Sequence, residues 1–213
     1  CRKRQVLEEL NAKTLDMLLS QAPKKTYPRG STVINAGDPS DGLYFIEYGR
    51  VHVLITDDEG REVILAALGA GEFFGEMALI DSQDRSASVV TLEETQFRII
   101  SKAAFQESLA RYPEISYHML IGLVKRLREA NQKIEGLALL DVYGRLTRTL
   151  LQMARPENGQ LVITNKPTHQ EIANMIGASR EMVTRLFRDL INGNYLSVDA
   201  HRIVLREKLP ERW

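Results

Sequence analysis

Cysteine is almost absent from this sequence, since Cys1 is the only one among 213 residues. An internal disulfide needs two cysteines and a cysteine-ligated iron–sulfur cluster needs several, so both are excluded within the chain. The four histidines are His52, His118, His169 and His201, and none of them forms a closely spaced metal motif. The sequence therefore predicts no metal site.

Long apolar runs are also absent. None approaches the roughly 20 residues that a membrane-spanning helix needs, and the opening CRKRQVLEELNAK lacks the apolar stretch of a secretory signal. We therefore expect a cytoplasmic protein with no membrane partner.

Net charge is zero, with 28 basic and 28 acidic side chains. The two halves differ, however: 17 basic residues stand against 20 acidic ones before Asp141, and 11 against 8 from Asp141 onward. A basic excess confined to the C-terminal end is expected if only that end meets nucleic acid.

A β-rich segment runs from Tyr27 to about Ile100. Runs such as LYFIEY, RVHVLIT and QFRII are separated by glycine-containing turns, a pattern typical of antiparallel barrels and sandwiches. Asp58-Glu59-Gly60, between two such runs, predicts a hairpin turn. Before this segment, EELNAKTLDMLLSQA has helical spacing and should pack on the barrel.

A long helix is predicted after Pro113. Apolar residues recur along it at alternating steps of three and four, which is the narrow seam of a coiled coil: Leu120, Leu123, Leu127, Ala130, Ile134 and Leu137. The alternatives are a parallel dimer and a helix packed on its own domain. The remaining helix surface is largely charged, which favours the dimer.

The chain from Asp141 onward has the order of a winged helix-turn-helix. A helix (VYGRLTRTLLQMA), a loop (RPENGQ) and a strand (LVIT) precede two helices joined at Gly177, and the runs LSV and RIVL follow. We therefore predict an α+β protein. A jelly-roll-like β-barrel domain would span residues 1–112, a dimerisation helix and hinge 113–140, and a winged helix-turn-helix DNA-binding domain 141–213.

Residues 71–90, GEFFGEMALIDSQDRSASVV, contain the groups best suited to a ligand. Gly75 permits close backbone approach, and FGEMALI can begin a short helix whose free amides point at an anion. Arg85 and Ser86 suit a phosphate, whereas a carboxylate at Glu76 suits a hydroxyl of the same ligand, such as a ribose 2′-OH. Taken singly, each is equally well explained as a turn or surface residue. Together, between strands, they indicate a sugar-phosphate ligand.

This segment resembles the phosphate-binding cassette of cyclic-nucleotide-binding domains. The matching residues are Phe74-Gly75-Glu76-Met77-Ala78-Leu79, followed by Arg85-Ser86-Ala87. The resemblance implies that the backbone at Gly75 and Met77 holds the cyclic phosphate, that Glu76 binds the ribose 2′-OH, and that Arg85 and Ser86 complete the phosphate clamp. Haem-binding relatives exist in the same superfamily, but an intact cassette argues against haem here.

The residues for base recognition depart from the family pattern. In the cyclic-AMP receptor branch of the cyclic-AMP receptor/fumarate-nitrate regulator superfamily, a Thr-Ser pair on the long helix contacts adenine. The stretch from Arg126 to Asn131 places Ala130 and Asn131 there. Ala130 cannot hydrogen-bond a base, whereas Asn131 offers a donor and an acceptor. Asn131 is therefore a candidate ligand residue, and Arg126, at the start of the same stretch, is a further candidate. Cyclic AMP is the first expected ligand, with cyclic GMP, cyclic di-GMP and a ligand-free active form as alternatives.

Residues 168–190, THQEIANMIGASREMVTRLFRDL, predict the DNA-reading helices. Thr168 and Ser179 can each cap a helix. The outward face of the second helix would carry Arg180, Glu181, Thr184 and Arg185. Arginine suits bidentate contact with guanine and glutamate accepts from cytosine N4, as in a recognition helix. The alternative, a merely solvated first turn, fits the surrounding caps, turn and apolar face less well.

Ser179-Arg180-Glu181-Met182-Val183-Thr184-Arg185 is similar to the Ser-Arg-Glu-x-Val-x-Arg recognition helix of the cyclic-AMP receptor family, and 137–145 is similar to its hinge. The resemblance spans nearly the whole chain. It implies a homodimer on palindromic double-stranded DNA with TGTGA-like half-sites one helical turn apart. Arg180 and Arg185 would read guanines and Glu181 a cytosine, while Lys166, His169 and Arg202 are candidates for phosphate contact. The remaining candidate DNA-binding residues are Thr168, Ser179 and Thr184. RNA polymerase is an implied partner through 155–160, a loop that is short here.

Two other classes of protein fit the sequence less well. An enzyme would use Glu76 and Arg85 as active-site groups, but no paired carboxylates, nucleophile–base motif or metal cluster accompanies them. A regulatory subunit of a kinase or channel would share the cassette, but it has no reason to carry a recognition helix. We predict a non-enzymatic transcription regulator in which ligand binding remodels the dimer helix and turns two recognition helices into register.

Overall fold

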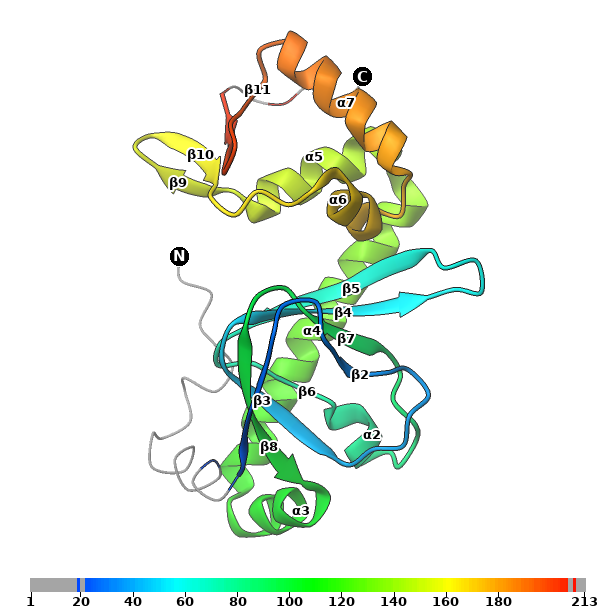
Figure 1. Ribbon diagram of the computed structural model, residues 1–213, viewed down its shortest axis with the longest axis vertical. Helices are drawn as coiled ribbons and strands as arrows, with labels where there is room; N and C mark the ends of the chain where they lie inside the picture. Colours follow the sequence, from blue (N-terminus) through cyan, green and yellow to red (C-terminus); the bar gives the residue numbers. More distant parts are fainter. Residues whose placement is uncertain (1–18, 20–21, 207–208, 210–213) are drawn as a thin grey trace. The chain divides into compact units, whose positions relative to one another are not determined.

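The computed structural model describes residues 19, 22–206 and 209 (Figure 1). The helix predicted over EELNAKTLDMLLSQA lies almost entirely outside these residues, as does Cys1. The chain divides into two compact units, Cys1–Asp57 with Ile64–Arg128 and Asp58–Val63 with Glu129–Trp213. The limits given above for the domains stay predictions.

Two four-stranded antiparallel sheets form the first unit. One has the order β1-β8-β3-β6 and the other β2-β7-β4-β5. Their strands are β1 (Lys24–Tyr27), β2 (Thr32–Ile34), β3 (Gly42–Tyr48), β4 (Arg50–Thr56), β5 (Glu62–Gly69), β6 (Phe73–Phe74), β7 (Ser88–Thr91) and β8 (Thr95–Ser101). Neighbours far apart in sequence, such as β1 with β8, give the jelly-roll-like arrangement predicted for this part of the chain.

The core between the sheets is made of alternate residues from both. Ile46 of β3 and Phe97 of β8 come from one sheet, and Val51 of β4 and Val89 of β7 from the other, in a single buried cluster. Aromatic rings contribute to this cluster: the ring centroids of Phe74 and Phe97 lie 5.5 Å apart in an edge-to-face contact. Buried and less buried residues alternate along β7, as the period of two in a pleated sheet predicts. The first five residues of β3 are all buried, because that strand is covered on both faces.

Helices cover the outer face of the first sheet. They are α2 (Glu76–Ile80), α3 (Lys102–Arg111) and the beginning of α4 (Pro113–Leu139). Phe105 of α3 and Ile115 of α4 are buried with Phe45 of β3 in one cluster. The long helix predicted after Pro113 is α4. Helix α3 was not predicted, although Ser101 caps it by accepting from the amide of Ala104.

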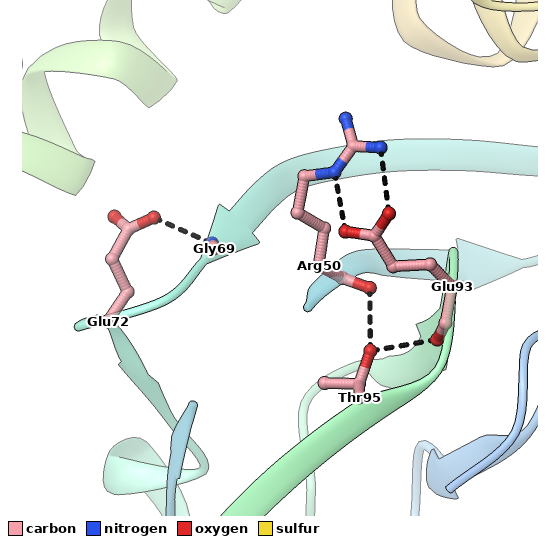
Figure 2. Close-up of polar contacts among 5 residues, drawn as sticks. All are labelled: Arg50, Gly69, Glu72, Glu93 and Thr95. Atoms are coloured by element: carbon pink, nitrogen blue, oxygen red, sulfur yellow. Dashed lines mark hydrogen bonds and ion pairs between the residues drawn. The ribbon is translucent and has the colours of Figure 1, made fainter. Parts of the chain in front are cut away.

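A polar cluster fixes the turn between β3 and β4 (Figure 2). Gly49 has φ +93°, and a Cβ there would lie 2.4 Å from Thr95 Oγ1. The Thr95 hydroxyl lies 2.9 Å from the Glu93 carbonyl oxygen and 3.4 Å from that of Arg50. The Arg50 guanidinium donates to both carboxylate oxygens of Glu93. At the turn between β5 and β6, Gly69 N donates to Glu72 Oε2 at 2.9 Å. The contacts of Arg50, Glu93 and Thr95 join the β3–β4 turn to the turn before β8.

Within this cluster we expect the buried hydroxyl to stabilise the fold more than the ion pair. Thr95 is fully buried, so Thr95→Val should remove the hydroxyl donor to the Glu93 carbonyl and lower the free energy of unfolding by about 1–3 kcal/mol. Arg50→Met should cost less than about 1 kcal/mol, because both side chains of the pair are more than 40% exposed. Urea unfolding of the two variants measures the difference. A larger loss for Arg50→Met would contradict this ranking.

The second unit has the predicted order of a winged helix-turn-helix. It contains α5 (Val142–Met153), β9 (Arg155–Glu157), β10 (Gln160–Ile163), α6 (His169–Ile176), α7 (Arg180–Asn192), β11 (Leu196–Val198) and β12 (Ile203–Leu205). Its sheet has the order β11-β12-β10-β9. Leu146 and Leu150 of α5, Ile172 of α6, Leu190 of α7 and Ile203 of β12 are all fully buried in one core.

The prediction of a loop over 155–160 was wrong. Residues Arg155–Glu157 form β9, which pairs antiparallel with β10. Asn158 and Gly159 connect the two strands with φ of +49° and +79°. Two positive φ values are those of a type I′ turn, for which Asn-Gly is the preferred pair. The Asn-Gly dipeptide is therefore the sequence signal for this hairpin, and the loop prediction did not take it into account.

Candidate functional site

The cassette begins at Gly75, between β6 and α2. Gly75 is the N-cap of α2 with φ +82°, a left-handed conformation that residues with a Cβ rarely adopt. A Cβ at this position would also lie 2.4 Å from Arg85 Nη1. Two separate constraints therefore require glycine here, one from the backbone conformation and one from the close approach of the guanidinium.

Arg85 is buried, with only 3% of its side chain exposed. Its Nη1 donates to the Gly75 carbonyl at 2.8 Å, while Nη2 donates to the Gly42 carbonyl at 2.8 Å and to Asp41 Oδ1 at 2.7 Å. The guanidinium thus holds the cassette against the start of β3. Its contact with a ligand phosphate stays a prediction.

Asp41 also lies beside Tyr44. The Tyr44 hydroxyl donates to Asp41 Oδ2 at 3.3 Å. Burial, followed by the negative charge of Asp41, raises the pKa of Tyr44 to about 12. Neither Asp41 nor Gly42 was predicted, because no spacing rule connects the start of β3 to a residue more than forty positions away.

Glu76 and Arg126 form an ion pair between α2 and α4. Arg126 Nη1 lies 2.7 Å from Glu76 Oε1, and its Nη2 donates to the Phe73 carbonyl. The guanidinium also lies over the Phe73 ring, 4.9 Å from its centroid. Glu76 is 3% exposed, so a buried carboxylate is paired here with a cation on the long helix. Both residues were predicted, but their pairing was not.

The other predicted ligand residues are more accessible. Met77 is 52% exposed, and exposed Ser86 places its Oγ 3.7 Å from Met77 Sδ. Asn131 is exposed on α4 and belongs to the second unit of the chain. The structure thus brings Arg85 to Gly75 and Ser86 to Met77 within the cassette, while the role of Asn131 stays a prediction.

The helix-turn-helix has the predicted caps and turn. Thr168 accepts from the amide of Glu171 and Glu171 accepts from the amide of Thr168, which is a capping box. Gly177 ends α6 with φ +62°, and Ser179 caps α7 by accepting from the amide of Met182. These bonds satisfy helix-end amides that would otherwise lack partners.

One face of α7 is buried and the opposite face is exposed. The buried side chains are Val183, Leu186, Phe187 and Leu190. The exposed side chains include Arg180, Glu181, Thr184 and Arg185. This division places all four predicted base-reading residues on the solvent side, together with the cap residue Ser179.

Arg145 holds the turn from α5, a contact that the sequence analysis did not foresee. Its Nε donates to the Ile176 carbonyl at 2.8 Å and its Nη2 to the Gly177 carbonyl at 3.4 Å. Its Nη1 donates to the Leu140 carbonyl at 2.9 Å. One side chain therefore links the end of the long helix to the turn between α6 and α7.

The candidate phosphate-binding residues lie around the beginning of α6 and the turn between β11 and β12. Lys166 Nζ donates to the Asp199 carbonyl at 2.8 Å, and Arg202 Nε donates to Asp199 Oδ2 at 2.8 Å. Hydrogen bonds from the backbone amide of His201 and from Arg202 lower the pKa of Asp199 to about 2. A hollow at this place is lined by Lys166, Pro167, Thr168, His169, Phe187, Val198 and Ile203.

Two family models match the chain. The cyclic nucleotide-binding domain covers residues 24–112 and the Crp-like helix-turn-helix domain covers residues 144–211. The cAMP-activated global transcriptional regulator Vfr of Pseudomonas aeruginosa is 39% identical over 204 residues, covering 91% of this chain and 94% of that protein. The chain belongs to the CRP family of transcription regulators.

Other relatives agree with this assignment. The cAMP-activated regulator CRP of Escherichia coli O157:H7 is 36% identical over 200 residues, covering 90% of this chain and 93% of that protein. The structure of the c-di-GMP responsive global regulator CLP of Xanthomonas campestris is similar with a TM-score of 0.83 and 31% identity, covering 93% of this chain and 100% of that one. This CRP-family protein is therefore a DNA-binding transcription regulator with a cyclic-nucleotide-binding domain.

The part of the chain that the structure describes was searched for membrane-spanning helices and for metal-binding clusters. Within that part of the chain, no helix is long and apolar enough to cross a membrane. The same residues contain no group of three or more His, Cys, Asp or Glu side chains that could hold a metal ion.

Proposed function

We propose that this regulator binds cyclic AMP at the Gly75–Ser86 cassette and then, as a homodimer, binds a palindromic operator with TGTGA-like half-sites. The buried pair of Glu76 and Arg126 is the observation that carries the proposal. A carboxylate is costly to bury unless it has a defined partner, and Arg126 holds this one by a single oxygen. The carboxylate is thereby oriented beside Gly75 and Arg85, so a ribose hydroxyl and a cyclic phosphate can be bound together.

The long helix supports the homodimer. Leu120, Leu127, Ile134 and Leu137 of the predicted seam are each more than half exposed in the single chain. An exposed row of large apolar side chains at coiled-coil spacing is stabilised when a second copy covers it. The proposed dimer brings two α7 helices to one palindrome.

The second candidate ligand is cyclic di-GMP. It is favoured by the likeness to the c-di-GMP responsive regulator CLP and by Ala130, whose methyl group cannot hydrogen-bond a base. Cyclic GMP and a ligand-free active form are further outcomes of the same test. The proposal also includes three further points: the protein is not an enzyme, it is located in the cytoplasm, and it contacts RNA polymerase. The proposed contact with RNA polymerase is the β9–β10 hairpin, which the structure shows where a loop was predicted.

Fluorescence anisotropy of a labelled duplex with two TGTGA half-sites tests the proposal. At one fixed salt concentration, we expect affinity about 100-fold or more above that for an unrelated duplex, and only in the presence of cyclic AMP. Specific binding of the palindrome only in the presence of cyclic di-GMP would show that cyclic di-GMP, and not cyclic AMP, is the ligand. Equal tight binding with and without every nucleotide would overturn the ligand-controlled mechanism, and no preference for the palindrome would overturn the proposed operator.

A further inference from the structure

His169 lies at the contact between α6 and α7, the two helices of the helix-turn-helix. It is the first residue of α6, and its ring packs against Phe187 of α7 with the ring centroids 4.7 Å apart. Its Nδ1 lies 2.9 Å from Oγ1 of Thr184, which is on the exposed face of α7. A titratable ring on α6 therefore contacts one of the side chains proposed to read bases.

The direction of this hydrogen bond depends on the tautomer of the neutral imidazole and on its protonation. In the neutral ring with its proton on Nε2, Nδ1 accepts from the Thr184 hydroxyl. Oγ1 then offers DNA only lone pairs, which suit the amino groups of adenine or cytosine. In the protonated ring both nitrogens are donors, so Nδ1 donates to Oγ1 and the Thr184 hydroxyl hydrogen can reach guanine O6 or N7 or thymine O4.

The charges around the ring favour the neutral form in the free protein. Burial, followed by the positive charges of Lys166 and Arg180, lowers the pKa of His169. Lys166 precedes α6, and Arg180 is on α7. At the turn between β11 and β12, the opposite charges of Asp199 and Arg202 are paired with each other.

Bound DNA changes this balance. Lys166, Thr168 and His169 line the same hollow, where a DNA phosphate would add a negative charge beside the two cations. A nearby anion favours the charged form of histidine. The complex therefore holds protons more firmly than the free protein, and linkage requires that affinity increase as the pH falls.

We infer that His169 is a positioning residue that orients the Thr184 hydroxyl, and that each protomer takes up a proton at His169 when it binds DNA. This inference rests on the proposed DNA-binding function. The proton comes from solvent and returns to it on dissociation, so binding needs no other reactant. Because the hydroxyl reverses its direction, the base preferred at the position facing Thr184 changes with pH.

Anisotropy titrations between about pH 5.5 and pH 8, around the range in which histidine titrates, test the inference at constant ionic strength. The wild-type protein with saturating activating nucleotide should bind the palindrome more tightly as the pH falls, with a slope of up to about one logarithmic unit per pH unit for each protomer. His169→Gln keeps a donor and an acceptor but does not titrate, so its affinity should be flat over this range. The matched control is His201→Gln, which alters the exposed histidine at the turn between β11 and β12 and should keep the wild-type slope.

Calorimetry in two buffers of different ionisation heat counts the protons directly and needs no variant. Uptake of protons by the wild type that disappears in His169→Gln is the expected result. Binding that is specific but independent of pH, or an unchanged slope in His169→Gln, would overturn the inference and leave the proposed function standing. Absence of specific binding at every pH would instead overturn the proposed function.

Discussion

Replacing Gly75 by alanine should abolish nucleotide-dependent DNA binding. The new Cβ would meet Arg85 Nη1 at 2.4 Å, and the guanidinium is held by three protein acceptors, so it has little room to move. Displacing it would remove the charge-assisted hydrogen bonds that Arg85 is proposed to donate to the phosphate, each worth about 1.5–3 kcal/mol. We therefore expect cyclic AMP affinity to fall about 100-fold or more, measured by calorimetry on the full-length protein.

Gly60→Ala provides the matched control. Gly60 has φ +77°, close to that of Gly75, but no heavy atom lies within 4 Å of the position of its Cβ. Both variants should lose about 1–2 kcal/mol of stability from backbone strain, whereas only Gly75→Ala should lose the ligand. Urea unfolding without nucleotide separates the two effects. Equal ligand affinities in the two variants would contradict the role of the close approach between Gly75 and Arg85.

The second large effect is expected at the recognition helix. Arg180→Ala should weaken binding to the palindrome by about 10- to 100-fold for each half-site, because the variant cannot form the bidentate hydrogen bonds to guanine. Binding to an unrelated duplex should change little. The measurement is a pair of anisotropy titrations at the same salt concentration, one with the palindrome and one with the unrelated duplex.

Lys166→Ala removes the same charge from a proposed phosphate-binding position. It should weaken binding to both duplexes about equally, and it should reduce the slope of log affinity against log salt by about one for each phosphate that the variant no longer neutralises. If Arg180→Ala weakened the two duplexes equally, Arg180 would bind a phosphate and the proposed reading of guanine would be wrong.

The DNA-binding part of the fold was the most predictable from sequence. Its signals are local: Thr168 and Glu171 form a capping box, Gly177 supplies the left-handed turn, and Ser179 caps the next helix. The apolar residues of α7 recur at helical spacing, which fixes the exposed face without any knowledge of tertiary contacts. The wrong assignment of a loop over 155–160 came from overlooking the Asn158-Gly159 turn.

The nucleotide-binding part was less predictable because its contacts are distant in sequence. The four residues Gly75, Glu76, Arg85 and Ser86 could be chosen for their chemistry within one short segment. Their partners could not be chosen in that way. Asp41 is 44 positions from Arg85, and Arg126 is 50 positions from Glu76. α3 was missed although its N-cap signal is present, since its burial of Phe105 depends on the sheet that it covers.

The sequence by itself determined the class of this protein: a strand-rich nucleotide-binding domain, a long helix and a winged helix-turn-helix, with the chemistry of each site assigned to named residues. Such features are set by local conformational preference and by spacing within one element. Only the tertiary structure decided how those residues are held. Packing placed a buried carboxylate against Arg126, engaged Arg85 with the backbone of the cassette and set His169 against Thr184. Hydrogen bonds of this kind form only when the packed core brings distant segments within about 3 Å, and no local pattern specifies that distance.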